Sequence, residues 1–456
     1  MTDVPVTKNQ DIELHIDDLG AEGQGVGRYN GYAVFVPGAL PGETVRAHIV
    51  KAGKAYGVGK LIEVITASEQ RTDPACEAFG RCGGCTLMHL SYAGQLAYKQ
   101  ERVRQALLRI GKFGDIKVLP VIGMDGPIRY RNKGAFCAGV DTDGGPALGL
   151  YAARSHYLVP VSDCAIEHPA CAAAMRAVTA WMREFGVSSY DEASGKGLLK
   201  HLVVRTSAPG EAMVILCTNG QLLPGEGALV KRLQDAVPGL ASVAWCVITR
   251  PTNVILDGPV RVVWGADAIR ERIAGLELAL SPRAFFQVNT EQAEKLYEHA
   301  VALTGAENGG LLLDAYCGIG AIGLLAARRG ARVIGVESVR EAVRDAEANA
   351  SLNGLTNIRF VCGKAEEVIP KLLESGEKPD AVVLDPPRKG CEASLLEAIA
   401  NAGIARVVYV SCNPATLARD LALLKERGYA PGPVQPVDMF PHTAHVECVI
   451  GIRRKA

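Results

Sequence analysis

The feature that most constrains this chain is a regular alternation of strand and helix patterns over residues 290–456, with a glycine-rich turn after its first strand. Leu311–Ala315 has the apolar pattern of a buried strand, and Gly318-Ile319-Gly320-Ala321-Ile322-Gly323 leads into a helix at 320–329. Strands that alternate with helices form a parallel sheet covered on both faces, so we predict a Rossmann-like, doubly wound α/β sheet. Its other expected elements are strands at 332–337, 380–384 and 406–410, helices at 340–353, 393–402 and 415–427, and an antiparallel edge pair at 434–438 and 445–452.

The glycine-rich turn and the strand ends beside it predict a nucleotide site. Glycine lets the backbone approach a ligand closely, and Glu337, at the end of the second strand, can accept both hydroxyls of a ribose. This pattern fits a dinucleotide and S-adenosylmethionine alike. Asp385 directly follows the expected strand at 380–384 and is followed by Pro386 and Pro387, which stiffen the loop. A carboxylate in this place can orient a cofactor or hold the amide edge of a nucleobase.

A cysteine and a glutamate near the end of the chain are the candidates for chemistry. Cys412 lies in Ser411-Cys412-Asn413-Pro414, between the strand at 406–410 and the helix that Pro414 begins. Because the helix dipole favours a thiolate, we expect the pKa of Cys412 to lie below its free value of about 8.5, as suits a nucleophile. Glu447 stands in an otherwise apolar strand, where burial would raise its pKa and make it a general base.

The length of 456 residues corresponds to roughly three domains. Residues 1–67 contain short strand patterns separated by glycine turns, which is typical of a small closed barrel of the OB kind, a fold often used on RNA. Residues 68–285 combine a cysteine-rich connector, a helix at 91–112 and a strand-rich region. We therefore expect a multidomain α/β protein with an OB-like barrel at 1–67, a central mixed α+β domain at 68–285 and the doubly wound domain at 286–456.

The connector contains a cluster of cysteines that predicts a metal site. Cys76, Cys82 and Cys85 fall within ten residues, among glycines that let the loop wrap closely. Cys164 and Cys171 are the candidates for a fourth ligand. Zinc and a [4Fe–4S] cluster both accept four thiolates, and the spacing does not separate them.

The charge of the chain excludes a globally basic nucleic-acid binder, since Lys and Arg together number 49 and Asp and Glu also number 49. Any such contact must be local. Residues 95–135 hold nine Lys and Arg against three acids and end in Arg129-Tyr130-Arg131-Asn132-Lys133, so we predict phosphate contacts there. The chain begins without a signal-peptide pattern and has no apolar run of membrane length. We expect a cytoplasmic monomer without a membrane partner.

These motifs together resemble the RNA uracil-5-methyltransferases, in particular the iron–sulfur bacterial enzymes that methylate uridine in 23S ribosomal RNA. The N-terminal stretch 23–28 with Pro41-Gly42-Glu43 is similar to a TRAM domain, an RNA-binding barrel. The segments that resemble catalytic-domain signatures of the family are Phe285-Phe286-Gln287-Val288-Asn289, Asp314-Ala315-Tyr316-Cys317-Gly318, Leu384-Asp385-Pro386-Pro387-Arg388, Ser411-Cys412-Asn413-Pro414 and Phe440-Pro441-His442-Thr443-Ala444-His445-Val446-Glu447.

The resemblance implies methylation of carbon 5 of a uridine in 23S ribosomal RNA, with Cys412 as nucleophile and Glu447 as base. It also implies that helix 91–112 packs with the methyltransferase domain. The residues implied to hold S-adenosylmethionine are Gln287, Tyr316, Glu337 and Asp385. The residues implied to bind a [4Fe–4S] cluster are Cys76, Cys82, Cys85 and Cys164.

Three alternatives differ from this interpretation. A transfer-RNA uracil-5-methyltransferase would use the same chemistry, but the minimal enzymes of that kind lack both the cluster and the barrel. An NAD-dependent oxidoreductase with an iron–sulfur centre is compatible with the glycine turn and Glu337, yet it gives Cys412 and Glu447 no role. A non-catalytic RNA-binding or assembly factor would not need Cys412 at all.

Overall fold

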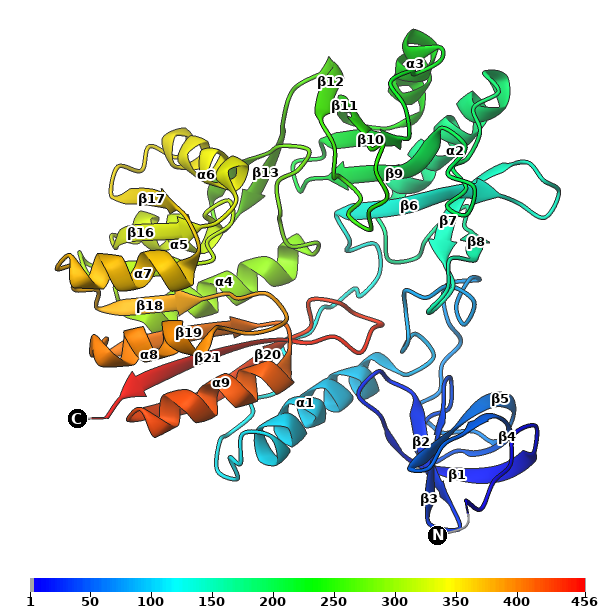
Figure 1. Cartoon of the computed structure of the whole chain (residues 1–456), viewed down its shortest axis with the longest axis horizontal. Coiled ribbons are helices and arrows are strands. Elements are labelled where there is room, and N and C mark those ends of the chain that lie inside the picture. The colour runs from blue at the N-terminus through cyan, green and yellow to red at the C-terminus, as the bar shows by residue number, and fades with distance from the viewer. Residues whose placement is uncertain (1–3, 456) are drawn as a thin grey trace. The chain divides into compact units, whose positions relative to one another are not determined.

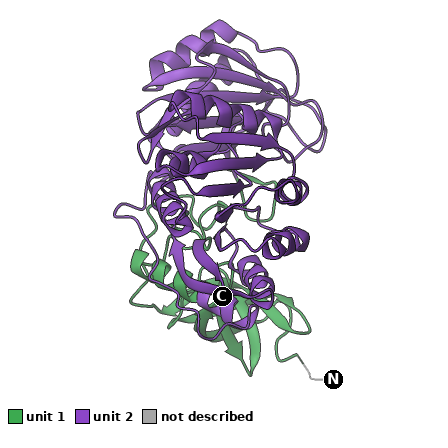
Figure 2. Cartoon of the chain, turned by 90° about the vertical axis from the view of Figure 1, so that its left-hand side faces the viewer, with its two compact units in different colours: residues 1–102, 151–159, 440–445 green, residues 103–150, 160–439, 446–456 purple. Residues whose placement is uncertain are grey.

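The computed structural model describes residues 4–455, and the chain divides into two compact units, coloured separately in Figure 2. The first unit contains the N-terminal barrel and the connector, and the second contains the C-terminal seven-stranded sheet and most of the central one, whose residues 151 and 158–159 belong to the first unit. Figure 1 labels the helices and strands. The first unit consists of residues 1–102, 151–159 and 440–445, and the second of residues 103–150, 160–439 and 446–456.

A closed five-stranded barrel opens the first unit, which confirms the small barrel predicted from the glycine turns. Along β1, Ile12, Leu14 and Ile16 alternate inward and are buried in the barrel core. A side chain at Gly27 on β2 would collide with the backbone carbonyl of His15, so this close pairing requires glycine. The strands, in the order β1-β2-β3-β5-β4 around the barrel, are β1 (Asp11–Leu19), β2 (Gly25–Tyr29), β3 (Tyr32–Val36), β5 (Tyr56–Thr66) and β4 (Thr44–Ala52).

The helix α1 (Tyr92–Arg109) follows the connector, in agreement with the helix predicted at 91–112. Its first turns hold the loop 440–445 of the same unit. The side-chain oxygen of Gln95 accepts a hydrogen bond from the amide of His442 at 2.8 Å, and Lys99 donates one to the carbonyl of Phe440 at 3.0 Å. Its later residues Val103 and Leu107 are buried in the core of the C-terminal sheet.

The central part of the second unit is a sheet in the order β12-β11-β10-β9-β6-β7-β8, with two helices packed against it. It agrees with the strand-rich α+β region predicted there. A separate hairpin, β13 with β14, follows it. The elements are β6 (Lys133–Val140), β7 (Pro146–Tyr151), β8 (Leu158–Pro160), α2 (Pro169–Glu184), β9 (Leu199–Thr206), β10 (Ala212–Thr218), α3 (Glu226–Ala236), β11 (Leu240–Val247), β12 (Val260–Gly265), β13 (Ile269–Ile273) and β14 (Leu276–Leu280).

The C-terminal sheet has the order β17-β16-β15-β18-β19-β21-β20, which confirms the doubly wound prediction and the antiparallel pair at one edge. Figure 1 shows α7, α8 and α9 side by side on the face of this sheet toward the viewer. The elements α4, β17 and α7 were not predicted from the sequence. The elements are α4 (Thr290–Thr304), β15 (Leu311–Ala315), α5 (Ala321–Arg328), β16 (Arg332–Glu337), α6 (Arg340–Leu352), β17 (Ile358–Cys362), α7 (Ala365–Glu374), β18 (Ala381–Leu384), α8 (Ala393–Asn401), β19 (Arg406–Ser411), α9 (Pro414–Glu426), β20 (Tyr429–Val437) and β21 (Glu447–Arg454).

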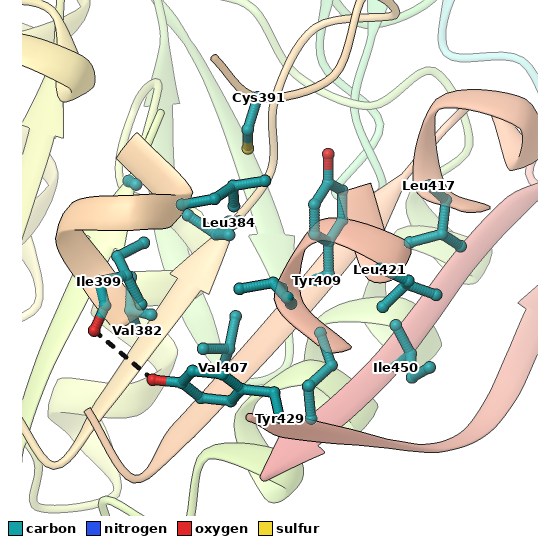
Figure 3. Packing of buried hydrophobic residues seen from close by; sticks show 14 of the residues in the cluster. Val382, Leu384, Cys391, Ile399, Val407, Tyr409, Leu417, Leu421, Tyr429 and Ile450 are labelled. Atoms are coloured by element: carbon teal, nitrogen blue, oxygen red, sulfur yellow. Dashed lines mark hydrogen bonds between the residues drawn. The ribbon is translucent and has the colours of Figure 1, made fainter. Parts of the chain in front are cut away.

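The core beneath α7, α8 and α9 fixes the strands of this sheet (Figure 3). Tyr409 and Tyr429 are fully buried in it, and the hydroxyl of Tyr429 donates to the carbonyl of Ile404 at 2.7 Å. Burying an apolar side chain of this size contributes about 1.5–3 kcal/mol. The strand ends that carry the candidate site are therefore anchored in a well-packed core.

Candidate active site

The candidate site lies at the edge of the C-terminal sheet where its parallel strands end. The strand order reverses between β15 and β18, and ligands of doubly wound sheets bind outside the carboxyl ends of the strands at this point. Because β21 runs antiparallel to β19, the beginning of β21 lies at the same edge as the end of β19. The side chains brought to this edge are Asp314, Glu337, Asp385, Cys412 and Glu447.

The glycine-rich turn after β15 has the close packing that its sequence predicts. The amide of Gly323 donates to the carboxylate of Asp314 at 2.8 Å, and a side chain at Gly323 would collide with that carboxylate. Glu337 accepts from the amide of Gly318 at 3.1 Å and from the amide of Val339 at 2.8 Å. The carboxylate of Glu337 is therefore held beside the turn, at the end of β16.

Gln287 and Tyr316, the other two expected cofactor residues, differ in what their polar groups contact. Gln287 is buried just before α4, and its side-chain amide has no hydrogen-bond partner within the described residues 4–455. Tyr316 directly follows β15 with a left-handed φ of 63°, and its hydroxyl interacts with the thiol of Cys391. The amide of Gln287 is available to a ligand, whereas the hydroxyl of Tyr316 is engaged within the protein.

Cys412 sits where the sequence places it, between β19 and α9. The helix α9 begins at Pro414. Asn413 caps it, because its side-chain oxygen accepts a hydrogen bond from the amide of Ala415 at 3.1 Å. Ser411 is the register partner of Cys448 on the antiparallel strand. Cys412 follows Ser411, and Glu447 precedes Cys448. Because the two strands are antiparallel, this register puts Cys412 and Glu447 next to each other.

Burial controls the ionisation of the two carboxyls at this edge. Glu447 is 3% exposed, and desolvation raises its pKa to about 8, helped by repulsion from Asp385 and opposed by Arg388. Desolvation also raises the pKa of Asp385 to about 7. The raised pKa of Glu447 confirms the sequence prediction, and it suits a group that takes up a proton near neutral pH.

The prediction for the thiol of Cys412 was wrong. Its pKa is raised to about 11, first by burial and then by the charges of Glu447 and Asp385, and the guanidinium of Arg388 only partly offsets them. The position at a helix start was correctly predicted, but burial, together with two carboxyls that other strands contribute, outweighs the helix end. The thiol is therefore protonated at neutral pH when the site has no ligand.

Three residues near the reacting groups were not singled out from the sequence. Asp314 is buried, one of its carboxylate oxygens has no hydrogen-bond partner among residues 4–455, and burial and Asp385 raise its pKa to about 7. Burial raises the pKa of Tyr297 on α4, and the nearby Asp385, Glu447 and Asp314 raise it further. Arg388 interacts with both Cys412 and Glu447. A carboxylate inside an apolar strand was a usable signal for Asp314, as it was for Glu447.

The thiols of the connector loop are half-buried, and Cys76 and Cys82 interact electrostatically. The amide of Gly84 donates to the sulfur of Cys82 at 3.4 Å. Cys164, in the second unit, is buried. Among residues 4–455, no group of three or more His, Cys, Asp or Glu side chains is arranged to hold a metal ion. The geometry of the described chain thus does not by itself display the predicted cluster.

Two arginines of the basic stretch, where phosphate contacts are predicted, form ion pairs within the protein. Arg129 forms a two-pronged ion pair with Asp163 at 2.6 and 2.7 Å, and Arg131 pairs with the buried Glu167 at 3.0 Å. Both guanidinium groups therefore stabilise the segment before α2. No helix within residues 4–455 is long and apolar enough to cross a membrane.

Comparisons with known proteins agree with this geometry. Residues 276–455 match the family model described as tRNA (Uracil-5-)-methyltransferase, and residues 5–62 match the TRAM domain. An uncharacterized RNA methyltransferase of Halalkalibacterium halodurans is 45% identical over 99% of this chain and 98% of its own length. A protein of Clostridium acetobutylicum with the same description is 42% identical, over 99% of this chain and 98% of its own length.

A solved structure resembles the fold over nearly its full length. The tRNA (uracil-54, C5)-methyltransferase of Pyrococcus abyssi, in complex with S-adenosyl-L-homocysteine, has a TM-score of 0.80 and 28% sequence identity to this chain. The similarity covers 96% of this chain and 99% of that protein.

Proposed function

The chain belongs to the RNA uracil-5-methyltransferase family, whose methyl donor is S-adenosylmethionine, and from this premise we propose that it methylates a uridine of 23S ribosomal RNA through a covalent bond from Cys412. The observation that carries the proposal is that the pair Ser411–Cys448 ends the β19–β21 ladder, which puts Cys412, just after β19, beside the buried Glu447 that begins β21. A thiol nucleophile beside a carboxyl that ionises near neutral pH matches the needs of this reaction. The family membership leaves no role for the NAD alternative.

Carbon 5 of uracil is a weak nucleophile, so the ring must first be activated. The sulfur of Cys412 adds to carbon 6, and the electron pair of the 5,6 double bond moves into an enolate. The methyl donor supplies an electrophilic methyl group, which carbon 5 accepts. Glu447 then removes the proton from carbon 5, and the restored double bond expels the sulfur of Cys412. The target base must leave its stack to reach the pocket.

The donor would be held by Gln287, Tyr316, Glu337 and Asp385. Glu337 at the end of β16 is placed for the ribose hydroxyls, and the unpartnered amide of Gln287 is available for the donor or the base. Asp385 has a pKa of about 7, so its carboxyl is able to accept or donate a hydrogen bond at neutral pH. Tyr316, Glu337 and Asp385 lie at strand ends, and Gln287 lies just before α4.

The test is a comparison of single variants with RNA and donor present. Cys412→Ala should abolish methyl transfer, whereas Cys362→Ala, which changes an exposed cysteine at the end of β17, should leave it intact. Glu447→Gln should accumulate a covalent protein–RNA adduct, seen as a slower band on a denaturing gel. Methyl transfer by Cys412→Ala, or rapid turnover by Glu447→Gln, would contradict the mechanism.

The choice of ribosomal RNA rests on the family resemblance of the full chain, including its TRAM domain and cysteine loop. Transfer RNA is the second candidate, favoured by the structural similarity to an archaeal tRNA (uracil-54, C5)-methyltransferase. We expect 5-methyluridine to disappear from 23S ribosomal RNA, and not from transfer RNA, in a strain that lacks this protein. We also propose that the protein acts as a cytoplasmic monomer, as expected for a chain whose site is built from a single copy.

We further propose that Cys76, Cys82 and Cys85, with Cys164 as the fourth ligand, bind a [4Fe–4S] cluster. Support comes from the three thiols in one short loop and from the amide that donates to the sulfur of Cys82. No step of the reaction passes through this group, and its proposed role is structural.

A further inference from the structure

Arg388 lies in the loop after β18, and its backbone is tied to the residues that flank Cys412. The side-chain amide of Asn413 donates to the carbonyl of Arg388 at 3.2 Å, and the hydroxyl of Thr416 donates to the same carbonyl at 3.3 Å. Asn413 directly follows Cys412, and Thr416 is in the first turn of α9. The backbone of Arg388 is therefore held beside the residues that flank the thiol by two hydrogen bonds.

The loop is also fixed beyond Arg388. The guanidinium of Arg419 donates to the carbonyl of Lys389 at 3.0 Å, and the amide of Cys391 donates to the buried carboxylate of Asp420 at 2.9 Å. Both anchoring residues belong to α9, the helix that begins after Cys412. A change in the side chain of Arg388 should therefore leave the path of the loop unchanged, because the anchors use backbone groups.

In the part of the chain that the structure describes, the guanidinium of Arg388 differs from its charged neighbours in having no partner. Lys389 forms an ion pair with Glu392 at 2.7 Å, and Arg419 pairs with Asp420 at 2.7 Å. Within the described residues, the exposed guanidinium of Arg388 has neither an ion pair nor a hydrogen bond. Its positive charge is thus uncompensated, and it acts on Cys412 and Glu447.

A thiolate at Cys412 needs a cation nearby, because its neighbours are carboxyls. Cys412 faces Glu447 from β21 and Asp385 from the end of β18, and both carboxyls oppose a thiolate. Tyr297 of α4 adds a neutral phenol near the two carboxyls. The group that opposes this effect, besides a backbone hydrogen bond at Cys412, is the guanidinium of Arg388.

We propose that Arg388 is a positioning residue that stabilises the thiolate of Cys412, and this inference rests on the proposed role of Cys412 as the nucleophile. The S–H bond of Cys412 breaks, the proton passes to water, and the electron pair stays on sulfur beside the guanidinium. A permanently charged arginine keeps this effect over the whole working pH range, whatever the protonation of Glu447 and Asp385.

The test measures the reactivity of Cys412 without RNA or methyl donor. The full chain is treated with iodoacetamide over a range of pH, and modification of Cys412 is followed by peptide mass spectrometry, with the exposed Cys362 as the internal reference. Arg388→Gln should lower the rate at Cys412 roughly tenfold at each pH below the thiol midpoint, equivalent to an upward shift of about one pKa unit. Arg388→Lys should retain most of the rate, and Lys389→Gln should match the wild type.

Three outcomes would overturn the inference. One is an unchanged rate at Cys412 in Arg388→Gln. A second is an equal loss in Lys389→Gln, which would indicate a general effect of surface charge. A third is a loss of methyl transfer in Arg388→Gln with unchanged thiol reactivity, which would assign Arg388 to RNA contact instead. Because the alkylation needs no substrate, failure of the proposed methyl transfer is detected separately, by activity in Cys412→Ala.

Discussion

At the scale of single residues, the site is a cluster of acids that cannot all be charged together. Glu447, Asp385 and Asp314 have pKa values raised to about 8, 7 and 7, and Cys412 has one raised to about 11. Such groups titrate as a coupled set, so protonating one carboxyl favours ionisation of another group. This coupling means that uptake of the carbon 5 proton by Glu447 would also favour the departing thiolate of Cys412.

The pH dependence of adduct breakdown should report the carboxyl of Glu447. Below its pKa of about 8 the carboxyl is protonated and cannot accept the carbon 5 proton, so breakdown should slow about tenfold per pH unit. The measurement is rapid quenching of a preformed protein–RNA adduct at several pH values. Following breakdown separates Glu447 from the ionisation of Cys412, which governs adduct formation. A breakdown rate independent of pH would exclude Glu447 as the base.

The raised pKa of Glu447 also makes the free energy of unfolding fall as pH rises. Glu447 keeps its proton in the folded chain up to a pKa of about 8, against an ordinary value of 4.5. As pH rises between these values the unfolded state loses the proton first, so the free energy of unfolding falls. Glu447→Gln has no such ionisation, so this pH-dependent loss is absent from it, and it serves as the matched control. A wild type that is not destabilised relative to this variant over that pH range would contradict the burial of the carboxyl.

At the scale of elements, α9 fixes both the nucleophile and the loop after β18. The buried carboxylate of Asp420 accepts from the hydroxyl of Tyr409 on β19 at 2.5 Å, from the amide of Cys391 at 2.9 Å and from the guanidinium of Arg419 at 2.7 Å. One side chain therefore joins a strand, a loop and a helix. The loop that it fixes carries Asp385 and Arg388.

Removal of this carboxylate should destabilise the protein strongly. Asp420→Ala removes the carboxylate acceptor of the Tyr409 hydroxyl and of the Cys391 amide inside the core, which should cost about 2–4 kcal/mol of the free energy of unfolding. Urea unfolding followed by circular dichroism measures the change. Glu392→Gln, which breaks the exposed ion pair with Lys389, is the control and should leave the midpoint unchanged. Equal midpoints for the two variants would show that Asp420 does not hold the loop.

The elements also show where sequence patterns were sufficient. The glycine turn, the start of α9 at Pro414 and the apolar strand around Glu447 have local signatures, and their positions were predicted correctly. The pKa of Cys412 depends on Asp385, Arg388 and Glu447, which approach it only when the sheet forms, and no local pattern contains this information. The ion pairs of Arg129 and Arg131 could not be predicted from local sequence either, because their acidic partners lie on another segment.

At the scale of the whole molecule, the chain combines a net charge of zero with an RNA substrate. Contact with phosphates must therefore come from local groups, and the internal use of Arg129 and Arg131 reduces the cations available in the stretch 95–135. The TRAM barrel contributes six Lys and Arg against nine acids over residues 1–70. Shape and base contacts, rather than overall charge, would then determine which RNA is bound.

The last prediction concerns the cluster proposed at the cysteine loop. Protein purified without oxygen should contain about four iron and four sulfide per chain, and Cys82→Ser should lose them while Cys362→Ser retains them. Since a bound metal stabilises only the folded chain, its removal by a chelator should lower the unfolding temperature. One zinc without sulfide would replace the iron–sulfur assignment by a zinc site. Protein free of metal, with an unfolding temperature that the chelator does not change, would remove the metal site altogether.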